Sequence, residues 1–334
     1  MTAAAQTFRS PTKPNLRPFD IRQDLIAVAN LVELCFADRL DDDGHRFIKQ
    51  MRAAANNLKR LGLAVPGINS FPMSMAGFVW HEKDELVGNL SLLPVSAMKE
   101  RAYLIANVAV HPEYRRRGIA RTLTEAALEH IRKRKVKWSW LQVDDDNPAA
   151  LNLYKNVGFT EQARRTTWQS NSPQEAQFKP LLQDITITSR RAKDWEAQQT
   201  WLSQIYPPEI SWHLSLRRPL LRSGIKGSLN RLIHDKRVRQ WSARRNNKLL
   251  GVLSLQSSTT QADKLWLAVP PEFEEAAIQA LLLLARRVSS PKRSLALDFP
   301  SGLAVKAIQN AGFYNHQTLV WMKREVESIP TSVL

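Results

Sequence analysis

The run of residues 107–124, NVAVHPEYRRRGIARTLT, leaves few options for the local fold. An apolar stretch at 103–110 ends at a proline, and a short basic loop follows it. From Ile119 onward, apolar residues recur at every fourth position through Leu123, Ala127 and Ile131, which is the spacing of one helix face. The pattern therefore predicts a strand, a basic loop and a helix in direct succession.

The basic loop has the properties of an anion-binding site. The first N–H groups of a helix have no intrahelical acceptor, and the helix dipole adds about half a positive charge at that end. Gly118 removes the side chain where a ligand would approach the backbone. We therefore expect a pyrophosphate to be held by backbone N–H groups together with Arg115, Arg116 and Arg117.

The spacing of this loop differs from the phosphate loop of ATP-binding proteins, GxxxxGK[ST]. The segment 115–120 instead resembles the acetyl-CoA loop [QR]xxGx[GA] of the Gcn5-related N-acetyltransferases (GNAT), and 110–115 fits the VxPxxR that usually precedes it. The resemblance implies that Ile119 and Ala120 also contact the cofactor, acetyl-CoA. It further implies that main-chain groups of Val108 and Val110 pair with the pantetheine arm.

A second signature lies at 147–159, NPAALNLYKNVGF, and resembles the family pattern NxxAxxLYxxxGF. By that resemblance Tyr154 is the general acid, and a phenol with a pKa near ~10 can protonate a leaving thiolate at neutral pH. Asn147 matches the asparagine that contacts the cofactor in the family. It is also a good helix N-cap, and both roles are compatible.

The general base is less well determined by the sequence. Many relatives carry a glutamate where this chain has Ala106. The best single candidate is Asp144, although a water molecule relayed to the backbone, or another carboxylate of the 144–146 run, would also serve. His81 and His111 are possible proton shuttles. No metal-ligand spacing is present, and we expect no metal cofactor.

The chain repeats itself in outline. Three short strings recur in order, at offsets of 251 − 88 = 163, 268 − 109 = 159 and 310 − 156 = 154 residues. Strands alternate with helices, so we expect an α/β fold of two tandem GNAT-like domains, each with a mixed, mostly antiparallel sheet flanked by helices. The predicted division is a tail at 1–15, a catalytic domain at 16–168, a linker at 169–184, a degenerate domain at 185–326 and a tail at 327–334.

The second copy loses the cofactor chemistry. In register, Arg115 and Arg116 become Glu274 and Glu275, which would repel a pyrophosphate, and Tyr154 becomes Ile308. Gly118 becomes Ala277 and Ala120 becomes Gln279. We therefore expect one active site, in the first half.

Along the first half, the expected helices are 21–36, 46–61, a helix from 119, and 148–156. The expected strands are 16–19, 77–81, 86–94, 103–110, 137–143 and a strand from 159. In the second half we expect a buried helix at 276–287. A turn is expected at 41–44 and a loop at 65–74.

The formal net charge of +17 makes anionic partners plausible. Nucleic acid is one candidate partner for residues 217–245, where basic residues accompany Trp241 and follow Trp212: Arg217, Arg218, Arg222, Lys226, Arg231, Lys236, Arg237, Arg239, Arg244 and Arg245. A solvated basic face is the simpler interpretation. The single cysteine, Cys35, predicts a reducing compartment, and with no apolar run near ~18 residues we expect a cytoplasmic protein without a membrane span.

Together these features predict an acetyl-CoA-dependent N-acetyltransferase that transfers an acyl group to a primary amine by direct attack in a ternary complex. The amine-bearing acceptor, a small molecule or a peptide, is expected between the first two helices and the loop 62–75, where Glu33 and the acidic residues 41–43 could attract it. Two alternatives remain. One is a CoA-binding sensor without catalysis, and the other is an acetyltransferase of ribosomal or tRNA targets that uses the basic second half.

Overall fold

The structure is a computed structural model, and it describes residues 15–37, 42–61, 76–97, 100–170, 184–214, 216–222, 238–258, 262–290 and 293–327. The strands are β1 (Leu16–Pro18), β2 (Ala76–Glu82), β3 (Glu85–Ala97), β4 (Glu100–Val110), β5 (Trp138–Asp144), β6 (Thr160–Ser170), β7 (Thr186–Ser189), β8 (Val238–Arg245), β9 (Lys248–Gln256), β10 (Ala262–Ala268), β11 (Ser294–Pro300) and β12 (Tyr314–Glu325). The α-helices are α1 (Ile21–Phe36), α2 (Asp42–Leu61), α3 (Ile119–Lys133), α4 (Pro148–Asn156), α5 (Trp195–Ile205), α6 (Pro208–Ser211), α7 (Arg218–Leu221), α9 (Glu275–Val288) and α10 (Val305–Asn310). Short 3-10 turns, η3 (Pro112–Tyr114) and η4 (Ala192–Asp194), precede α3 and α5.

The described strands form one continuous mixed sheet, in the order β1-β2-β3-β4-β5-β12-β6-β11-β10-β9-β8-β7. Neighbours are antiparallel except at β4–β5 and β10–β11, which are parallel. Read outward from the β12–β6 pair at its centre, the order is the same on both sides: fifth, fourth, third, second and first strand of each half. The repeat seen in the sequence is therefore a repeat of sheet topology.

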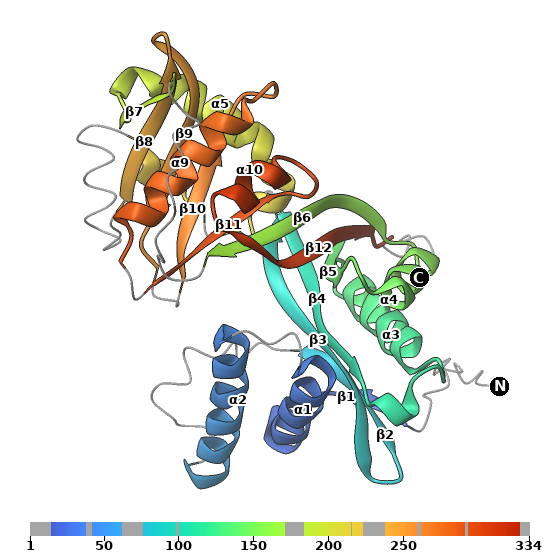
Figure 1. The fold of residues 1–334 in the computed structure, drawn as a ribbon. Helices are drawn as coiled ribbons and strands as arrows, with labels where there is room; N and C mark the ends of the chain where they lie inside the picture. Colours follow the sequence, from blue (N-terminus) through green and yellow to red (C-terminus); the bar gives the residue numbers. More distant parts are fainter. Residues whose placement is uncertain are drawn as a thin grey trace, which may run out of the picture.

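The last strand of each half has crossed into the other half. β12, at the C-terminal end, pairs with β5 of the first half, and β6 pairs with β11 of the second half. Figure 1 shows β6 and β12 side by side at the junction of the two halves. The exchanged strands also contribute side chains to the cores of the halves that they join. Val320 and Met322 of β12 are buried in the first core, and Trp168 of β6 is buried in the second.

Helices cover both faces of the sheet. In the first half, α3 and α4 pack on one face, and α1 and α2 pack together on the other. In the second half, α9 and α10 cover one face and α5 covers the opposite one. Among the described residues, no helix is both long enough and apolar enough to cross a membrane.

Local sequence signals explain the helix starts. The Asp20 side chain accepts a hydrogen bond from the Arg22 N–H before α1, and the Asn147 side chain accepts one from the Ala150 N–H, with Pro148 at the first position of α4. The predicted helices at 21–36 and 148–156 are confirmed to the residue. The second-half helix, predicted at 276–287, is also confirmed and contributes its leucines to the core.

Some expectations differ from the structure. The turn expected at 41–44 is wrong for residues 42–44, which already belong to α2. Most of the predicted linker lies outside the described residues, but residues 169 and 170 still belong to β6. The domain boundaries at 168 and 185 stay predictions, and the strand exchange means that sequence order alone cannot separate two sheets.

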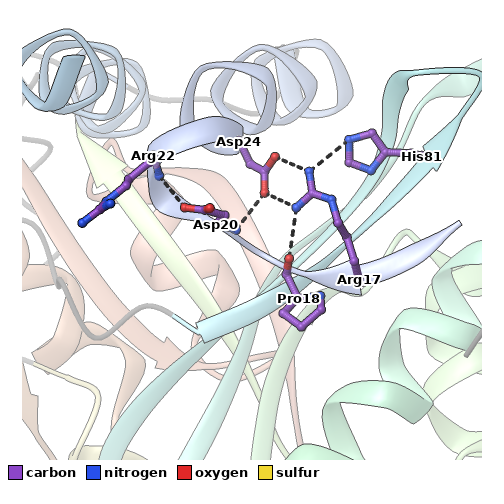
Figure 2. A network of polar contacts seen from close by, with 6 residues as sticks. All are labelled: Arg17, Pro18, Asp20, Arg22, Asp24 and His81. Carbon is purple, nitrogen blue, oxygen red and sulfur yellow. Dashed lines mark hydrogen bonds and ion pairs between the residues drawn. The ribbon is translucent and has the colours of Figure 1, made fainter. Parts of the chain in front are cut away.

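A partly buried ion pair ties the first strand to the first helix (Figure 2). Arg17 of β1 donates two hydrogen bonds to Asp24 of α1, at 2.7 and 2.6 Å, and the Asp20 N–H donates to Asp24 at 2.8 Å. Burial alone would raise the pKa of Asp24, but the hydrogen bonds from Arg17 and Asp20 outweigh it and lower this pKa. His81 lies 3.3 Å from the same guanidinium, and burial and the charge of Arg17 lower its pKa.

Replacing Arg17 by methionine should lower the free energy of unfolding by about 1–2 kcal/mol, because the buried Asp24 carboxylate loses its charged partner. The loss stays at the modest end because the Arg17 side chain is 39% exposed and solvent screens the pair. Urea denaturation measures the change. Arg22→Met is the matched control, since this exposed arginine contributes only its backbone N–H to the network. An equal loss in both variants would contradict the assignment.

Candidate active site

The site begins where two strands separate. β4 and β5 pair from Ala102–Trp138 to Ile105–Leu141, and no pairing follows although β4 continues to Val110 and β5 to Asp144. Residues 106–110 therefore present backbone groups toward a gap in the interior of the sheet. Buried backbone groups need partners, so such a gap suits a ligand with amide groups of its own.

A β-bulge causes the separation. Asn107 has a positive φ of 51°, and the β3–β4 register shifts between Asn89 and Ser91 at the same place. Asparagine tolerates this left-handed conformation better than most residues. The buried Asn89 side chain donates to the Asn107 carbonyl at 2.8 Å and holds the bulge in place. A bulge next to a functional site is a common way to re-aim a strand.

On one side of the gap lies a cavity of about 680 Å³, here termed the loop cavity. It runs from the basic loop to the end of β4 and is lined by Val108, Val110, Arg115, Arg116, Gly118, Ile119, Ala120, Arg121, Asp144, Asn147 and Tyr154, among others. The structure thus brings together nearly all of the residues that the sequence suggested. The remaining one, Arg117, donates to the Glu113 carbonyl and lies over the Tyr114 ring, outside this lining.

The loop presents backbone donors to this cavity. Arg116 and Gly118 both have positive φ, 66° and 79°, and Gly118 is the N-cap of α3 with no side chain capping the helix. A Cβ added to Gly118 would meet nothing within 4 Å, so the backbone there is open to a ligand. Arg115 donates to the Val110 carbonyl at 3.2 Å, which ties the loop to the end of β4. Phosphate groups fit this combination of N–H groups and guanidinium groups.

On the other side of the gap lies a cavity of about 460 Å³, here termed the strand cavity. Its walls include apolar residues of α1 and α2 (Val32, Phe36, Phe47 and Ile48) and polar residues of three strands (Asn107, Gln142, Asp144 and Gln317). Six residues line both cavities: Phe36, Val108, Asp144, Asn147, Ala150 and Tyr154. Two molecules bound in the two cavities would therefore meet beside Tyr154 and Asp144.

Tyr154 is buried on α4, and its ring packs edge-on against Phe159 at 6.0 Å between ring centres. Burial raises the pKa of Tyr154 above its usual value. A phenol in this environment stays protonated and is a proton donor rather than a base.

Of the other candidates for proton transfer, Asp144 lines both cavities, whereas His81 and His111 line neither. Asp144 accepts a hydrogen bond from Gln317 at 2.6 Å and lines both cavities. His81 belongs to the Arg17 network, and the ring of His111 accepts the Glu113 N–H, so neither is part of the two cavity walls. Glu33 is paired with Arg52 at 2.5 Å. The acceptor loop 62–75 and Asp41 lie outside the described residues.

Sequence reasoning missed three residues of the cavity walls. Arg121 lies within the first turn of α3, where one more basic position looked unremarkable. Cys35 served in the sequence analysis only to predict a reducing compartment, yet it lines the loop cavity and its thiol donates to the Val110 carbonyl at 3.3 Å. Gln317 comes from the second half, and no local pattern connects it with the site.

Several described basic residues of the stretch 217–245 already have partners within the protein, whereas Arg217 and Arg222 are exposed. Arg218 bonds Ser203 and the Tyr206 carbonyl, Arg244 forms a buried ion pair with Asp194, and Arg245 is paired with Glu274. Arg239 donates to the Val288 carbonyl. Lys226, Arg231, Lys236 and Arg237 lie outside the described residues. Nucleic-acid binding by this stretch therefore finds no support.

The second half contains the same gap, and its own side chains occupy part of it beside a smaller cavity of about 330 Å³. β10 and β11 pair only as far as Leu265–Leu297. The hydroxyl of the fully buried Tyr206 accepts the Leu267 N–H at 3.4 Å and donates to the Asp298 carbonyl at 3.0 Å. In the described part of the chain, no group of three or more His, Cys, Asp or Glu residues could hold a metal ion.

Comparison with known proteins agrees with this geometry. The model of the acetyltransferase (GNAT) family matches residues 66–159. The ribosomal protein bS18-alanine N-acetyltransferase of Escherichia coli is 28% identical over 107 residues, which cover 30% of this chain and 72% of that protein. A mycothiol acetyltransferase of Thermobispora bispora is 47% identical over 53 residues, 16% of this chain and 18% of that protein.

The fold as a whole also has a solved counterpart. A Gcn5-related N-acetyltransferase from Sphaerobacter thermophilus superposes with a TM-score of 0.54 at 15% identity, over 96% of this chain and 98% of that one. The matched segment 66–159 contains the bulged strand, the basic loop and α4 with Tyr154. The first half of the chain therefore contains a module of the acetyltransferase (GNAT) family, and by that module the protein is an acyltransferase.

Proposed function

We propose that this protein is an N-acetyltransferase that transfers an acetyl group from acetyl-CoA to a primary amine, by direct attack in a ternary complex. The observation that carries the proposal is the meeting of two cavities at one gap in the sheet, with Tyr154 and Asp144 in both walls. GNAT-fold proteins use acetyl-CoA, and the loop cavity offers it cationic and N–H donors at one end and the strand gap at the other.

The residues have the following roles in this proposal. Arg115, Arg116 and the N–H groups at the start of α3 hold the pyrophosphate, and Val108 and Val110 pair with the pantetheine arm through their main-chain groups. Asn147 supports the α4 end of the same cavity. Acetyl-CoA supplies the acyl carbonyl as a thioester. Bound this way, the reacting carbon lies at the gap, within reach of an amine in the strand cavity.

The proton transfers balance between two side chains. Asp144 takes the proton that the amine loses as its nitrogen bonds to the acyl carbon. Tyr154 gives its phenolic proton to the sulfur as the carbon–sulfur bond breaks. Exchange with solvent then restores both groups.

The acceptor class follows from the strand cavity. Its described wall contains one carboxylate, Asp144, and no lysine or arginine, whereas the loop cavity is cationic. The apolar side chains of α1 and α2 suit an amine with an apolar body. The two relatives described above are named as acetyltransferases of a ribosomal-protein alanine and of mycothiol, which fits an amino group on either a peptide or a small molecule.

Direct attack is favoured over an acyl-enzyme by the state of the cavity thiol. Burial raises the pKa of Cys35, and its proton is donated to the Val110 carbonyl. The thiolate is the reactive form of cysteine, so this thiol is a poor nucleophile.

Replacing Tyr154 by phenylalanine should lower kcat by about 100-fold or more, because the leaving sulfur loses its proton donor. Acetyl-CoA affinity and melting temperature should change little, since the ring is retained. Release of CoA, followed with a thiol reagent, gives the rate. Tyr103→Phe is the matched control, a tyrosine of the same core that lies in neither cavity wall. An unchanged kcat in Tyr154→Phe would remove the phenol from the mechanism.

Reversing the charge of Arg116 with glutamate should weaken acetyl-CoA binding by about tenfold or more, because a phosphate would face a carboxylate at the helix start. Isothermal titration calorimetry measures the dissociation constant. Arg134→Glu, an exposed change at the opposite end of α3, is the control and should bind acetyl-CoA like the wild type. Equal affinity in Arg116→Glu and the control would sink the proposed pyrophosphate position.

A ternary complex makes a kinetic prediction of its own. Initial-velocity lines measured at several amine concentrations should intersect, and labelled CoA should not exchange into acetyl-CoA when no amine is present. Parallel lines together with rapid exchange would instead indicate an acyl-enzyme, with Cys35 as the first candidate to carry it.

A further inference from the structure

The strand exchange brings a residue of the second half into the candidate active site. Leu319 of β12 pairs with Asp144 of β5, and Gln317 lies two residues before Leu319 on the same side of the strand. The Gln317 side-chain nitrogen lies 2.6 Å from one carboxylate oxygen of Asp144. Gln317 and Leu319 both line the strand cavity, together with Ala106, Asn107 and Tyr154 of the first half.

The chemistry of this contact fixes its direction. A carboxylate only accepts hydrogen bonds, so the Gln317 amide must donate through its nitrogen. An uncharged donor holds the carboxylate in one orientation without neutralising its charge. The amide oxygen of the same side chain is an acceptor, of the kind that an ammonium group can use.

We propose that Gln317 is a positioning residue of the active site: it orients the Asp144 carboxylate toward the acceptor amine, so that the second half completes the acceptor site of the first. This inference rests on the proposed function, because it assigns Asp144 to the amine. It explains why a copy without the cofactor loop contributes its last strand to the copy that has one.

The second half supplies a built-in comparison. There Thr167 of β6 pairs with Asp298 of β11, as Leu319 pairs with Asp144, and Arg165 lies two residues before Thr167, as Gln317 lies before Leu319. Arg165 forms a buried ion pair with Asp298 and donates to the Ile205 carbonyl at 2.8 Å. The same two positions thus hold an arginine-paired carboxylate in the second half and an amide-bonded carboxylate in the first, and each carboxylate lines a cavity.

The test is steady-state acetylation with acetyl-CoA and a panel of three probes: a short peptide with a free N-terminal alanine, a peptide with one internal lysine, and glucosamine. The full-length chain is used for wild type, Gln317→Met, Gln317→Arg, Asp144→Asn and the double variant Asp144→Asn/Gln317→Met. Methionine keeps the length of the glutamine side chain but cannot hydrogen-bond, and arginine reproduces the second-half pair. Tyr314→Phe is the control, because it removes an exposed hydrogen bond from the same strand.

We expect Gln317→Met to lower kcat/KM for the best amine by about tenfold or more, with the dissociation constant of acetyl-CoA within about twofold of wild type. Gln317→Arg should lower kcat/KM further, because it neutralises the carboxylate. The double variant should be no slower than Asp144→Asn alone, since Gln317 acts through Asp144. A purely structural role would instead give additive losses and a matching fall in acetyl-CoA affinity.

Two results overturn the inference alone, namely wild-type kcat/KM in Gln317→Met, or additive losses in the double variant. Should Gln317→Met fail to fold, Gln317→Arg replaces it in the comparison. The double variant Asp144→Asn/Gln317→Arg is then compared with Asp144→Asn alone, and wild-type kcat/KM in Gln317→Arg or additive losses in this double variant overturn the inference. A wild-type protein that binds acetyl-CoA but acetylates none of the three probes, or any other amine, overturns the proposed function, and this inference falls with it.

Discussion

An interruption of one hydrogen-bond ladder is the constraint on which the rest of the structure depends. After Ile105 and Leu141 the two parallel strands at the centre of the first half stop bonding each other, and backbone groups are left in the middle of a sheet. Unpaired backbone groups in a protein interior are costly, so something must satisfy them. The bulge at Asn107, held by Asn89, keeps that position open, and the two cavities are its consequence.

The two halves satisfy the backbone groups at this strand gap in different ways. In the second half a tyrosine hydroxyl bonds the backbone of both separated strands and an arginine pairs with the carboxylate, which leaves a smaller cavity of about 330 Å³. In the first half the corresponding space stays open between α1, the basic loop and α4. One architecture thus forms the candidate active site in the first half and an arginine-paired counterpart in the second, and the difference lies in a few side chains at the strand ends. The loss of the arginines and glycine at 274–279 accompanies this change.

Much of this could be predicted from the sequence, for a physical reason. Helix caps, periodic apolar residues and the basic loop are local signals, so α1, α3, α4 and many of the residues that line the loop cavity could be predicted from them. The strand exchange could not, because alternating side chains tell which face of a strand is buried but not which strand lies beside it. Gln317 was missed for the same reason. The arginines at 217–245 suggested a nucleic-acid surface that finds no support in the structure. Composition shows their charge, but it does not show that carboxylates and carbonyls of the protein already bind several of them.

The central position of β12 also governs the order in which the molecule can form. Its partners in the sheet are β6 and β5, and β5 precedes it by more than 150 residues. The first core is therefore complete only after Val320 and Met322 of β12 have packed into it. Contacts between such distant residues slow folding, and until they form the edges of β5 and β6 are exposed to other chains. During synthesis the first half therefore emerges as an incomplete acetyltransferase fold, and the wall of the strand cavity closes only once residues 314–325 have left the ribosome.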